Sequence, residues 1–206
     1  MELFEFIAEP GKNLLPCDGE VYYYGKLLDA AEAQHYFNLF LKNTPWQNDE
    51  VLMNGKRITT KRKIAWYAED KQHYTYSKIT KKAHLWTPEL IVLRDKIQDL
   101  TGEKFNSCLL NLYHDGSEGM GYHCDAEGDL QKDSAIASLS LGASRKFVFK
   151  HKTTKSKIEI YLHSGSLLLM KGATQRNWQH ALPPTVKVNS PRINLTFRRR
   201  VPRSEP

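Results

Sequence analysis

The sequence contains few cysteines and no long apolar run, and these absences narrow the class of protein. Its three cysteines, Cys17, Cys108 and Cys124, show no paired spacing, which argues against a disulfide framework and indicates reduced thiols in an intracellular protein. No apolar stretch approaches membrane-spanning length, and residues 1–6 carry two glutamates and no basic residue, unlike a secretory signal. We therefore expect no membrane association, and a location in the cytoplasm of a bacterium or the nucleus of a eukaryote.

An excess of acidic residues is also absent, because 30 lysines and arginines outweigh 23 aspartates and glutamates. Contacts of Lys and Arg with phosphate supply most non-specific affinity for nucleic acid, so the net charge of +7 favours such a partner, although proteins without one also carry such charges. Repeats and low-complexity linkers are missing. At 206 residues the chain suits one domain with its own core, and we expect a monomer.

The stretch from Asn111 to Asp125 ends in His123-Cys124-Asp125. Residues two apart in an extended strand point to the same face, so an imidazole and a carboxylate are presented together. Two histidines and one carboxylate on one side of an iron(II) ion leave positions open for oxygen chemistry. His180 is the best-placed third ligand. Most other histidines, including His151, have no acidic partner nearby in the sequence, and His114 lies in a turn-rich loop. By itself, a His-x-Asp match is more often a surface pair than a metal site.

Residues 192–198 alternate between apolar and polar side chains without a break, which predicts a strand. One face carries the apolar residues and the other carries the polar ones: Ile193, Leu195 and Phe197 against Arg192, Asn194, Thr196 and Arg198. If the apolar face packs into the fold, the polar face forms a receptor for a carboxylate, because guanidinium binds carboxylates in a bidentate fork. The alternative is a half-exposed edge strand with solvated arginines.

Taken together, Asn-x-Tyr at Asn111, His-x-Asp at His123, the later His180 and Arg-x-Asn-x-Thr-x-Arg at Arg192 resemble the AlkB family of Fe(II)- and 2-oxoglutarate-dependent dioxygenases. The likeness is strongest to its demethylases that act on duplex DNA. It extends from about Val51 to Arg200 and includes IASLSLGASRKFVFKHK and HSGSLLLMKG. It implies Fe(II), 2-oxoglutarate and O₂ as cofactor and cosubstrates.

The same resemblance implies roles for the residues of these motifs. The iron ligands would be His123, Asp125 and His180. Cosubstrate binding would fall to Asn111, Tyr113 and Arg198, with Arg198 at the distal carboxylate of 2-oxoglutarate. Arg192 would neutralise charge near Asp125 and the cofactor, and Asn194 and Thr196 would support the same cofactor-binding wall.

Substrate contacts are expected outside these motifs. Asn54-Gly55 is a strong hairpin signal, and in duplex-acting relatives a hairpin here carries an apolar wedge. Its tip would be Met53 and Asn54, with Arg62 close behind, unless the hairpin is simply exposed. Tyr74 and Tyr76 share a strand face and resemble the family's aromatic slot for a flipped base, although Lys78 replaces the family's glycine.

Two further residues are expected to contact the substrate. Glu127 matches an acidic residue that reaches the base in relatives and that favours a cationic methylated base, although a solvated loop residue is equally compatible. Arg145, together with the basic hairpin at residues 150–157, is expected to contact phosphates.

The predicted fold is α+β and mainly β: one domain built on a double-stranded β-helix, or jelly roll, at residues 105–200. An irregular arm is expected at residues 1–20. A helix and hairpin extension for nucleotide recognition is expected at 21–104, with one helix capped by Asp29 and Glu32 and another opened by Thr87-Pro88.

The expected activity is oxidative demethylation of N-alkylated bases in DNA, single- or double-stranded, of the 1-methyladenine and 3-methylcytosine type, with release of formaldehyde. Three alternatives stay open: the same chemistry on RNA or a protein side chain, a catalytically silent nucleic-acid-binding module, and a cupin-like metalloprotein that does not use 2-oxoglutarate.

Overall fold

The structure is a computed structural model that describes residues 11–53, 56–69, 73–76, 79–125 and 130–201. The described helices are α1 (Ala30–Asn43), α2 (Pro88–Thr101) and α3 (Thr174–Asn177). The described strands are β1 (Glu20–Lys26), β2 (Gln47–Met53), β3 (Lys56–Ala68), β4 (His73–Tyr76), β5 (Ile79–Lys82), β6 (His84–Leu85), β7 (Ser107–Tyr113), β8 (Met120–His123), β9 (Ile136–Gly142), β10 (Arg145–His151), β11 (Lys157–Leu162), β12 (Ser166–Lys171), β13 (Trp178–Leu182) and β14 (Arg192–Arg198).

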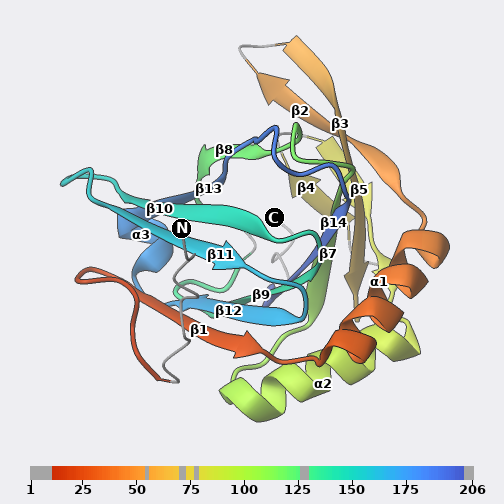
Figure 1. The fold of residues 1–206 in the computed structure, drawn as a ribbon, viewed down its shortest axis with the longest axis horizontal. Coiled ribbons are helices and arrows are strands. Elements are labelled where there is room, and N and C mark those ends of the chain that lie inside the picture. Colours follow the sequence, from red (N-terminus) through yellow and green to blue (C-terminus); the bar gives the residue numbers. More distant parts are fainter. Residues whose placement is uncertain (1–10, 54–55, 70–72, 77–78, 126–129, 202–206) are drawn as a thin grey trace.

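Two antiparallel sheets form the body of the protein (Figure 1). The large sheet has the order β1-β12-β9-β14-β7-β3-β2, with β6 added in parallel to β3. The small sheet has the order β11-β10-β13-β8, and β4 and β5 form a separate pair. Two facing antiparallel sheets are the architecture of a jelly roll, so the predicted fold class is confirmed.

The large sheet separates two hydrophobic clusters, and strand alternation decides which side chain enters which cluster. In β14, Ile193, Leu195 and Phe197 pack with residues of α1 and α2. Figure 1 shows these two helices along one side of the sheet. The other cluster, which includes Phe149 and Trp178, lies between the two sheets. The polar residues of β14 therefore face the interior between the sheets.

The two longer helices begin where their sequence signals predict. Asp29 caps α1 in a complete capping box, because its side chain accepts from the Glu32 backbone N–H at 2.8 Å while Glu32 accepts from the Asp29 N–H at 3.0 Å. Thr87 caps α2 and Pro88 occupies its first turn. Gly102 ends α2 at a φ of 73°, a left-handed conformation that favours glycine.

Of the strands before residue 104, β1, β2, β3 and β6 are hydrogen-bonded into the large sheet. β1 pairs with β12, while β3 pairs with β7 and also forms the predicted hairpin with β2. Residues 11–19 contain no helix or strand, as expected for the arm, and the Trp178 indole donates to the Cys17 carbonyl at 3.0 Å. Among the described helices, none has the length and apolar character required to span a membrane.

Candidate metal and cosubstrate site

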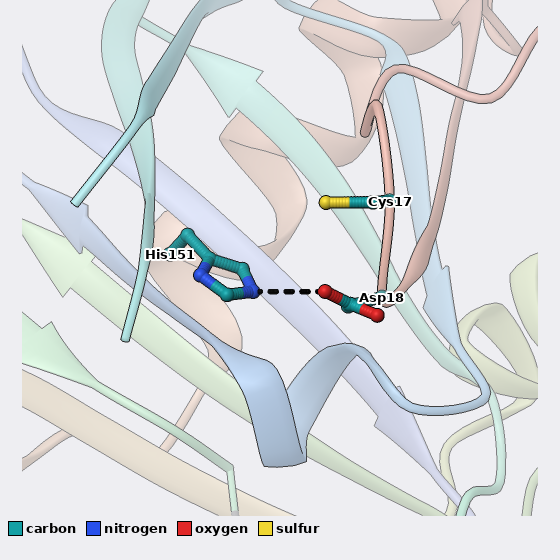
Figure 2. A group of neighbouring side chains, drawn as sticks. All are labelled: Cys17, Asp18 and His151. Atoms are coloured by element: carbon teal, nitrogen blue, oxygen red, sulfur yellow. Dashed lines mark ion pairs between the residues drawn. The ribbon is translucent and has the colours of Figure 1, made fainter. Parts of the chain in front are cut away.

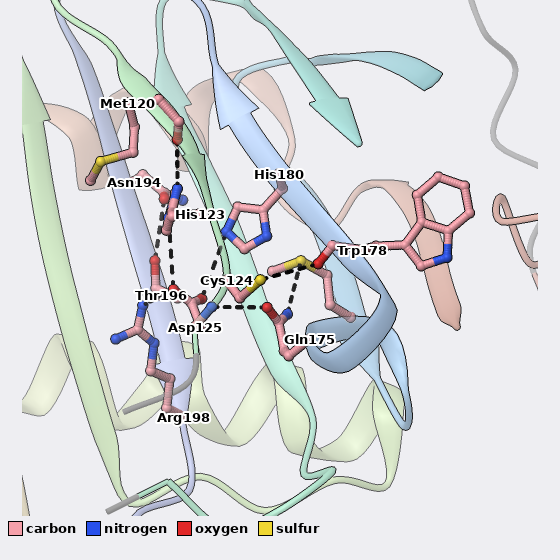
Figure 3. Close-up of polar contacts among 12 residues, drawn as sticks. Met120, His123, Cys124, Asp125, Gln175, Trp178, His180, Asn194, Thr196 and Arg198 are labelled. Carbon is pink, nitrogen blue, oxygen red and sulfur yellow. Dashed lines mark hydrogen bonds and ion pairs between the residues drawn. The ribbon is translucent and has the colours of Figure 1, made fainter. Parts of the chain in front are cut away.

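Three potential metal ligands meet between the sheets (Figure 3). His123 at the end of β8 pairs in register with His180 on β13. His123 Nε2 lies 3.8 Å from one Asp125 carboxylate oxygen, and His180 Nε2 lies 4.0 Å from the other. The structure thus brings together the three residues predicted as iron ligands. One detail differs from the prediction, because β8 ends at His123 and Asp125 lies beyond the strand.

The tautomer of His123 suits metal binding. Its Nδ1 lies 2.8 Å from the carbonyl oxygen of Gly121, so Nδ1 must carry the proton that is donated. The lone pair of Nε2 therefore stays available and faces Asp125. A ring held through its second nitrogen in this way is the usual arrangement of a metal-bound histidine.

The charge states of the buried ligands also suit a cation. Burial lowers the pKa of His180 to about 4, so its imidazole is neutral at pH 7. Burial alone would raise the pKa of Asp125, but the Arg198 guanidinium, with the two imidazoles, holds it below its usual value. Asp125 is thus ionised, and the group offers two neutral nitrogens and one carboxylate to Fe(II).

The polar face of β14 forms the adjoining wall, and here one expectation was wrong. Arg198 rather than Arg192 neutralises Asp125, because Arg198 Nη2 lies 3.1 Å from an Asp125 oxygen. The Arg192 guanidinium instead donates to the Ser140 hydroxyl at 2.9 Å and lies 5.7 Å from the centre of the Tyr113 ring. The two arginines at opposite ends of β14 therefore face different groups.

Arg192 is a buried cation that has no anionic partner among the described residues. It is 2% exposed, its Nε has no hydrogen-bond partner, and no carboxylate of the described residues lies within ion-pair distance of it. Burial lowers its pKa to about 10, which shows the cost of removing this charge from water. A carboxylate of 2-oxoglutarate would supply the missing partner, so the residues present fit this cosubstrate.

The edge-strand alternative for residues 192–198 is excluded. β14 pairs with β7 on one side and with β9 on the other, in the middle of the large sheet. Its arginines are buried for this reason. Asn194 donates to Ser138 Oγ at 2.8 Å and Thr196 donates to Asn194 Oδ1 at 3.2 Å, so the wall is ordered by its own hydrogen bonds.

A pocket that opens to solvent joins the metal group to this wall. Its lining contains every predicted residue of the metal and cosubstrate motifs, namely Asn111, Tyr113, His123, Asp125, His180, Arg192, Asn194, Thr196 and Arg198. Sequence reasoning missed Asp49, Met120 and Phe147, which also line the pocket. The ring of Phe147 stacks on that of His180, with centroids 5.4 Å apart.

Arg62 lies in the wall of this pocket and not behind the hairpin tip as expected. The turn of the hairpin follows Met53, whereas Arg62 lies near the far end of the β2–β3 pairing, between Thr59 and Lys63. Its guanidinium forms a buried ion pair with Asp49 and lies 3.5 Å from the Met120 sulfur. Long-range pairing of the carboxylate on β2 with the guanidinium on β3 draws the side chain inward.

Arg145 is buried against the backbone and not exposed where a phosphate could reach it, contrary to the sequence-based expectation. It is 1% exposed, and its guanidinium donates to backbone carbonyls of Asp115, Gly116, Glu118 and Pro183 at 2.8–3.3 Å. These bonds hold the loop before β8 against the segment after β13. A Cβ on Gly116 would come within 2.2 Å of the Thr185 carbonyl, so this close approach requires glycine. Arg145 therefore supports the ligand-bearing strands.

The remaining predicted substrate contacts lie outside the described part of the protein. This applies to Asn54 and Glu127, and to the side chains of Met53, Tyr74 and Tyr76, although Tyr74 and Tyr76 belong to β4.

A second group of potential ligands, Cys17, Asp18 and His151, lies where the arm meets β10 (Figure 2). His151 Nε2 lies 3.3 Å from an oxygen of Asp18, an acidic partner that is distant in the sequence. The backbone N–H groups of Thr153 and Thr154 both donate to His151 Nδ1, at 3.2 and 3.0 Å. The neutral ring must then carry its proton on Nε2, which leaves no lone pair there for a metal. This group holds the arm to β10.

A jelly roll with two histidines and one carboxylate between its sheets is the class of the non-haem iron oxygenases. The family model described as 2OG-Fe(II) oxygenase superfamily matches residues 20–198. The chain belongs to this superfamily and, within it, to the AlkB family. The superfamily uses Fe(II), 2-oxoglutarate and O₂.

The relatives support this placement. "DNA oxidative demethylase ALKBH2" of Homo sapiens is 36% identical over 203 residues, which cover 93% of this chain and 78% of that protein. "Alpha-ketoglutarate-dependent dioxygenase alkB homolog 3" of Bos taurus is 38% identical over 181 residues, which cover 83% of this chain and 63% of that protein. The solved structure of OsALKBH1 has a TM-score of 0.63 at 18% identity, covers 87% of this chain and 97% of its own, and shows the shared fold.

Proposed function

We propose that this protein is an Fe(II)- and 2-oxoglutarate-dependent demethylase that restores N-alkylated bases in DNA, of the 1-methyladenine and 3-methylcytosine type. The observation that carries the proposal is the pocket that joins His123, Asp125 and His180 to the buried guanidinium of Arg192. The names of relatives such as the DNA oxidative demethylase ALKBH2 support DNA as the substrate. We also propose that the protein acts inside the cell and that it is a monomer.

His123, Asp125 and His180 would hold the iron. Bound iron, with O₂ and 2-oxoglutarate, supplies the oxidation of the methyl carbon. One O₂ is consumed overall: 2-oxoglutarate becomes succinate and CO₂, the N-methyl group leaves as formaldehyde, and the cationic base becomes neutral with release of one proton. Arg198 keeps Asp125 ionised throughout, because its guanidinium stays beside the carboxylate.

We place the distal carboxylate of 2-oxoglutarate at Arg192, which reverses the role expected for Arg198. Tyr113 and Asn111 line the same part of the pocket and would complete the cosubstrate site. The mutual hydrogen bonds of Asn194, Thr196 and Ser138 hold this wall in place before the cosubstrate arrives. The apolar side chains of Phe147, Met170 and Leu182 cover other parts of the pocket and limit its water.

The substrate base would enter through the open side of the pocket, where His123 is only partly buried. Met53 and Asn54 remain the proposed wedge, and Tyr74, Tyr76 and Glu127 remain proposed contacts of the flipped base. Arg62 joins them from the pocket wall, together with its partner Asp49.

The test is anaerobic reconstitution with Fe(II) and 2-oxoglutarate, followed by air and an oligonucleotide with a single 1-methyladenine. Mass spectrometry should show loss of one CH₂ unit that depends on 2-oxoglutarate and is absent in Asp125→Ala. Duplex DNA, single-stranded DNA and matched RNA are compared. Succinate formed without repair of any oligonucleotide would contradict the proposal and favour a protein side chain. DNA binding without succinate formation would favour a catalytically silent nucleic-acid-binding module. Oxidation that does not require 2-oxoglutarate would favour a cupin-like metalloprotein.

A further inference from the structure

We propose that Gln175 is a positioning residue for the metal ligand Asp125, and that it couples Asp125 to the strand that carries His180. Sequence reasoning did not select this residue. The inference deepens the proposed function, because it rests on the iron site formed by His123, Asp125 and His180.

Asp125 lacks the strand support that the two histidines have. His123 and His180 are paired across β8 and β13, but β8 ends at His123. The backbone N–H of Asp125 donates instead to the side-chain carbonyl of Gln175, at 2.9 Å (Figure 3). A side-chain amide thus takes the place of a neighbouring strand at the position of the carboxylate ligand.

The two ends of the Gln175 amide are not interchangeable. Only the oxygen accepts a hydrogen bond from the Asp125 N–H, and the reversed amide would place two donors face to face. The NH₂ group then lies 3.7 Å from the sulfur of Met170, a weak acceptor on β12 that also lines the pocket. Gln175 therefore connects the backbone of a metal ligand with the opposite wall of the same pocket.

The backbone that carries Gln175 is itself fixed. Thr174, 1% exposed, donates from its hydroxyl to the Lys171 carbonyl at 2.7 Å and accepts from the Glu20 N–H at 2.8 Å. α3 runs directly into β13 at Trp178, whose carbonyl accepts from the Cys124 thiol at 3.4 Å. The segment that ends in His180 therefore holds the chain at both Cys124 and Asp125.

This arrangement places two of the three ligands in a fixed relation before any metal binds. Without the side-chain carbonyl of Gln175, the backbone N–H of Asp125 loses its hydrogen-bond partner. The backbone at Asp125 is then no longer fixed by this bond, and neither is the position of the carboxylate that it carries. Removal of outer hydrogen-bond partners of metal ligands typically weakens metal affinity by about 10–100-fold. We expect a loss of about 10-fold, because Arg198 continues to hold the carboxylate itself.

The test uses Co(II), whose visible absorption reports coordination geometry, as the probe for anaerobic titration of the whole protein. Gln175→Leu keeps the size of the side chain and removes the acceptor, whereas Gln175→Glu keeps an acceptor oxygen. Gln179→Leu is the matched control, since Gln179 alternates with the inward-facing Trp178 and His180 on β13 and does not line the pocket. Thermal melts of the metal-free variants establish that each is folded.

We expect Gln175→Leu to bind Co(II) about 10-fold more weakly with an altered absorption band, Gln175→Glu to recover most of the affinity, and Gln179→Leu to match the unsubstituted protein. A purely structural role would lower the melting temperature and leave affinity and band unchanged. That result, or a Gln175→Glu protein as weak as Gln175→Leu, would overturn the inference. An unsubstituted protein that takes up no Co(II) would overturn the iron site itself and the inference with it.

Discussion

Two buried arginines of similar exposure should respond in opposite ways to the same substitution. The Arg145 guanidinium donates to four backbone carbonyls, whereas Arg192, among the described residues, donates to the Ser140 hydroxyl and lies against the Tyr113 ring. A buried charge without a counter-ion costs several kcal/mol in proteins. The hydrogen bond and the ring contact of Arg192 return about 1 kcal/mol each. Arg192→Met should therefore leave the metal- and cosubstrate-free protein as stable as before, or more stable by about 1 kcal/mol.

The same substitution should remove most of the stabilisation that 2-oxoglutarate provides. A charge-assisted hydrogen bond contributes about 1.5–3 kcal/mol, so loss of the fork weakens 2-oxoglutarate binding by about 100-fold. At a concentration of about 100 times the original Kd, the ligand stabilises the unsubstituted protein by about 2.7 kcal/mol. In Arg192→Met the same concentration only equals the new Kd, and the stabilisation falls to about 0.4 kcal/mol.

Urea unfolding of the metal-free protein measures the first effect, and urea unfolding with Mn(II), with and without 2-oxoglutarate, measures the second. Arg145→Met is the control: it removes four hydrogen bonds from a buried guanidinium to backbone carbonyls and should lose about 3 kcal/mol or more of stability. Its stabilisation by 2-oxoglutarate should persist wherever it is folded. The reasoning is refuted if Arg192→Met is destabilised as strongly as Arg145→Met, or if it keeps the full response to 2-oxoglutarate.

Three further outcomes are expected. Asp49→Asn removes the carboxylate partner of the buried Arg62 and should lower the free energy of unfolding in urea by about 3 kcal/mol. The double variant Asp49→Leu with Arg62→Met should recover most of this loss. A double variant as unstable as the single variant would contradict this expectation. The hydrogen bond from the Asp29 backbone, together with Lys96, lowers the pKa of Glu32 in the folded protein. The ionised Glu32 carboxylate therefore stabilises the fold above its usual pKa of 4.5, and this contribution is lost as pH falls through its lower pKa in the folded protein. Stability of Glu32→Gln should therefore fall less steeply below pH 4.5 in urea melts, and equal slopes would refute the capping contribution. Asp125→Ala should abolish Co(II) uptake in titrations, and full uptake would exclude Asp125 as a ligand.

Much of the fold followed from the sequence because its signals are local. The alternation of residues 192–198, the capping box at Asp29 and the Thr87-Pro88 helix start each depend on neighbours within a few positions. The His-x-Asp spacing likewise identified two of the three residues that meet at the metal group. Periodicity and capping are properties of consecutive residues, so they can be read without knowledge of the tertiary structure.

Only the tertiary structure decided which residues distant in the sequence become contact partners. Because β14 lies in the middle of the sheet between β7 and β9, both of its arginines are buried, and Arg198 forms an ion pair with Asp125. The roles of Arg145 and Gln175 likewise depend on contacts 27–50 residues away. A side chain's charge and length are fixed by its identity, but its partner is fixed by strand register, which long-range packing of the whole sheet determines.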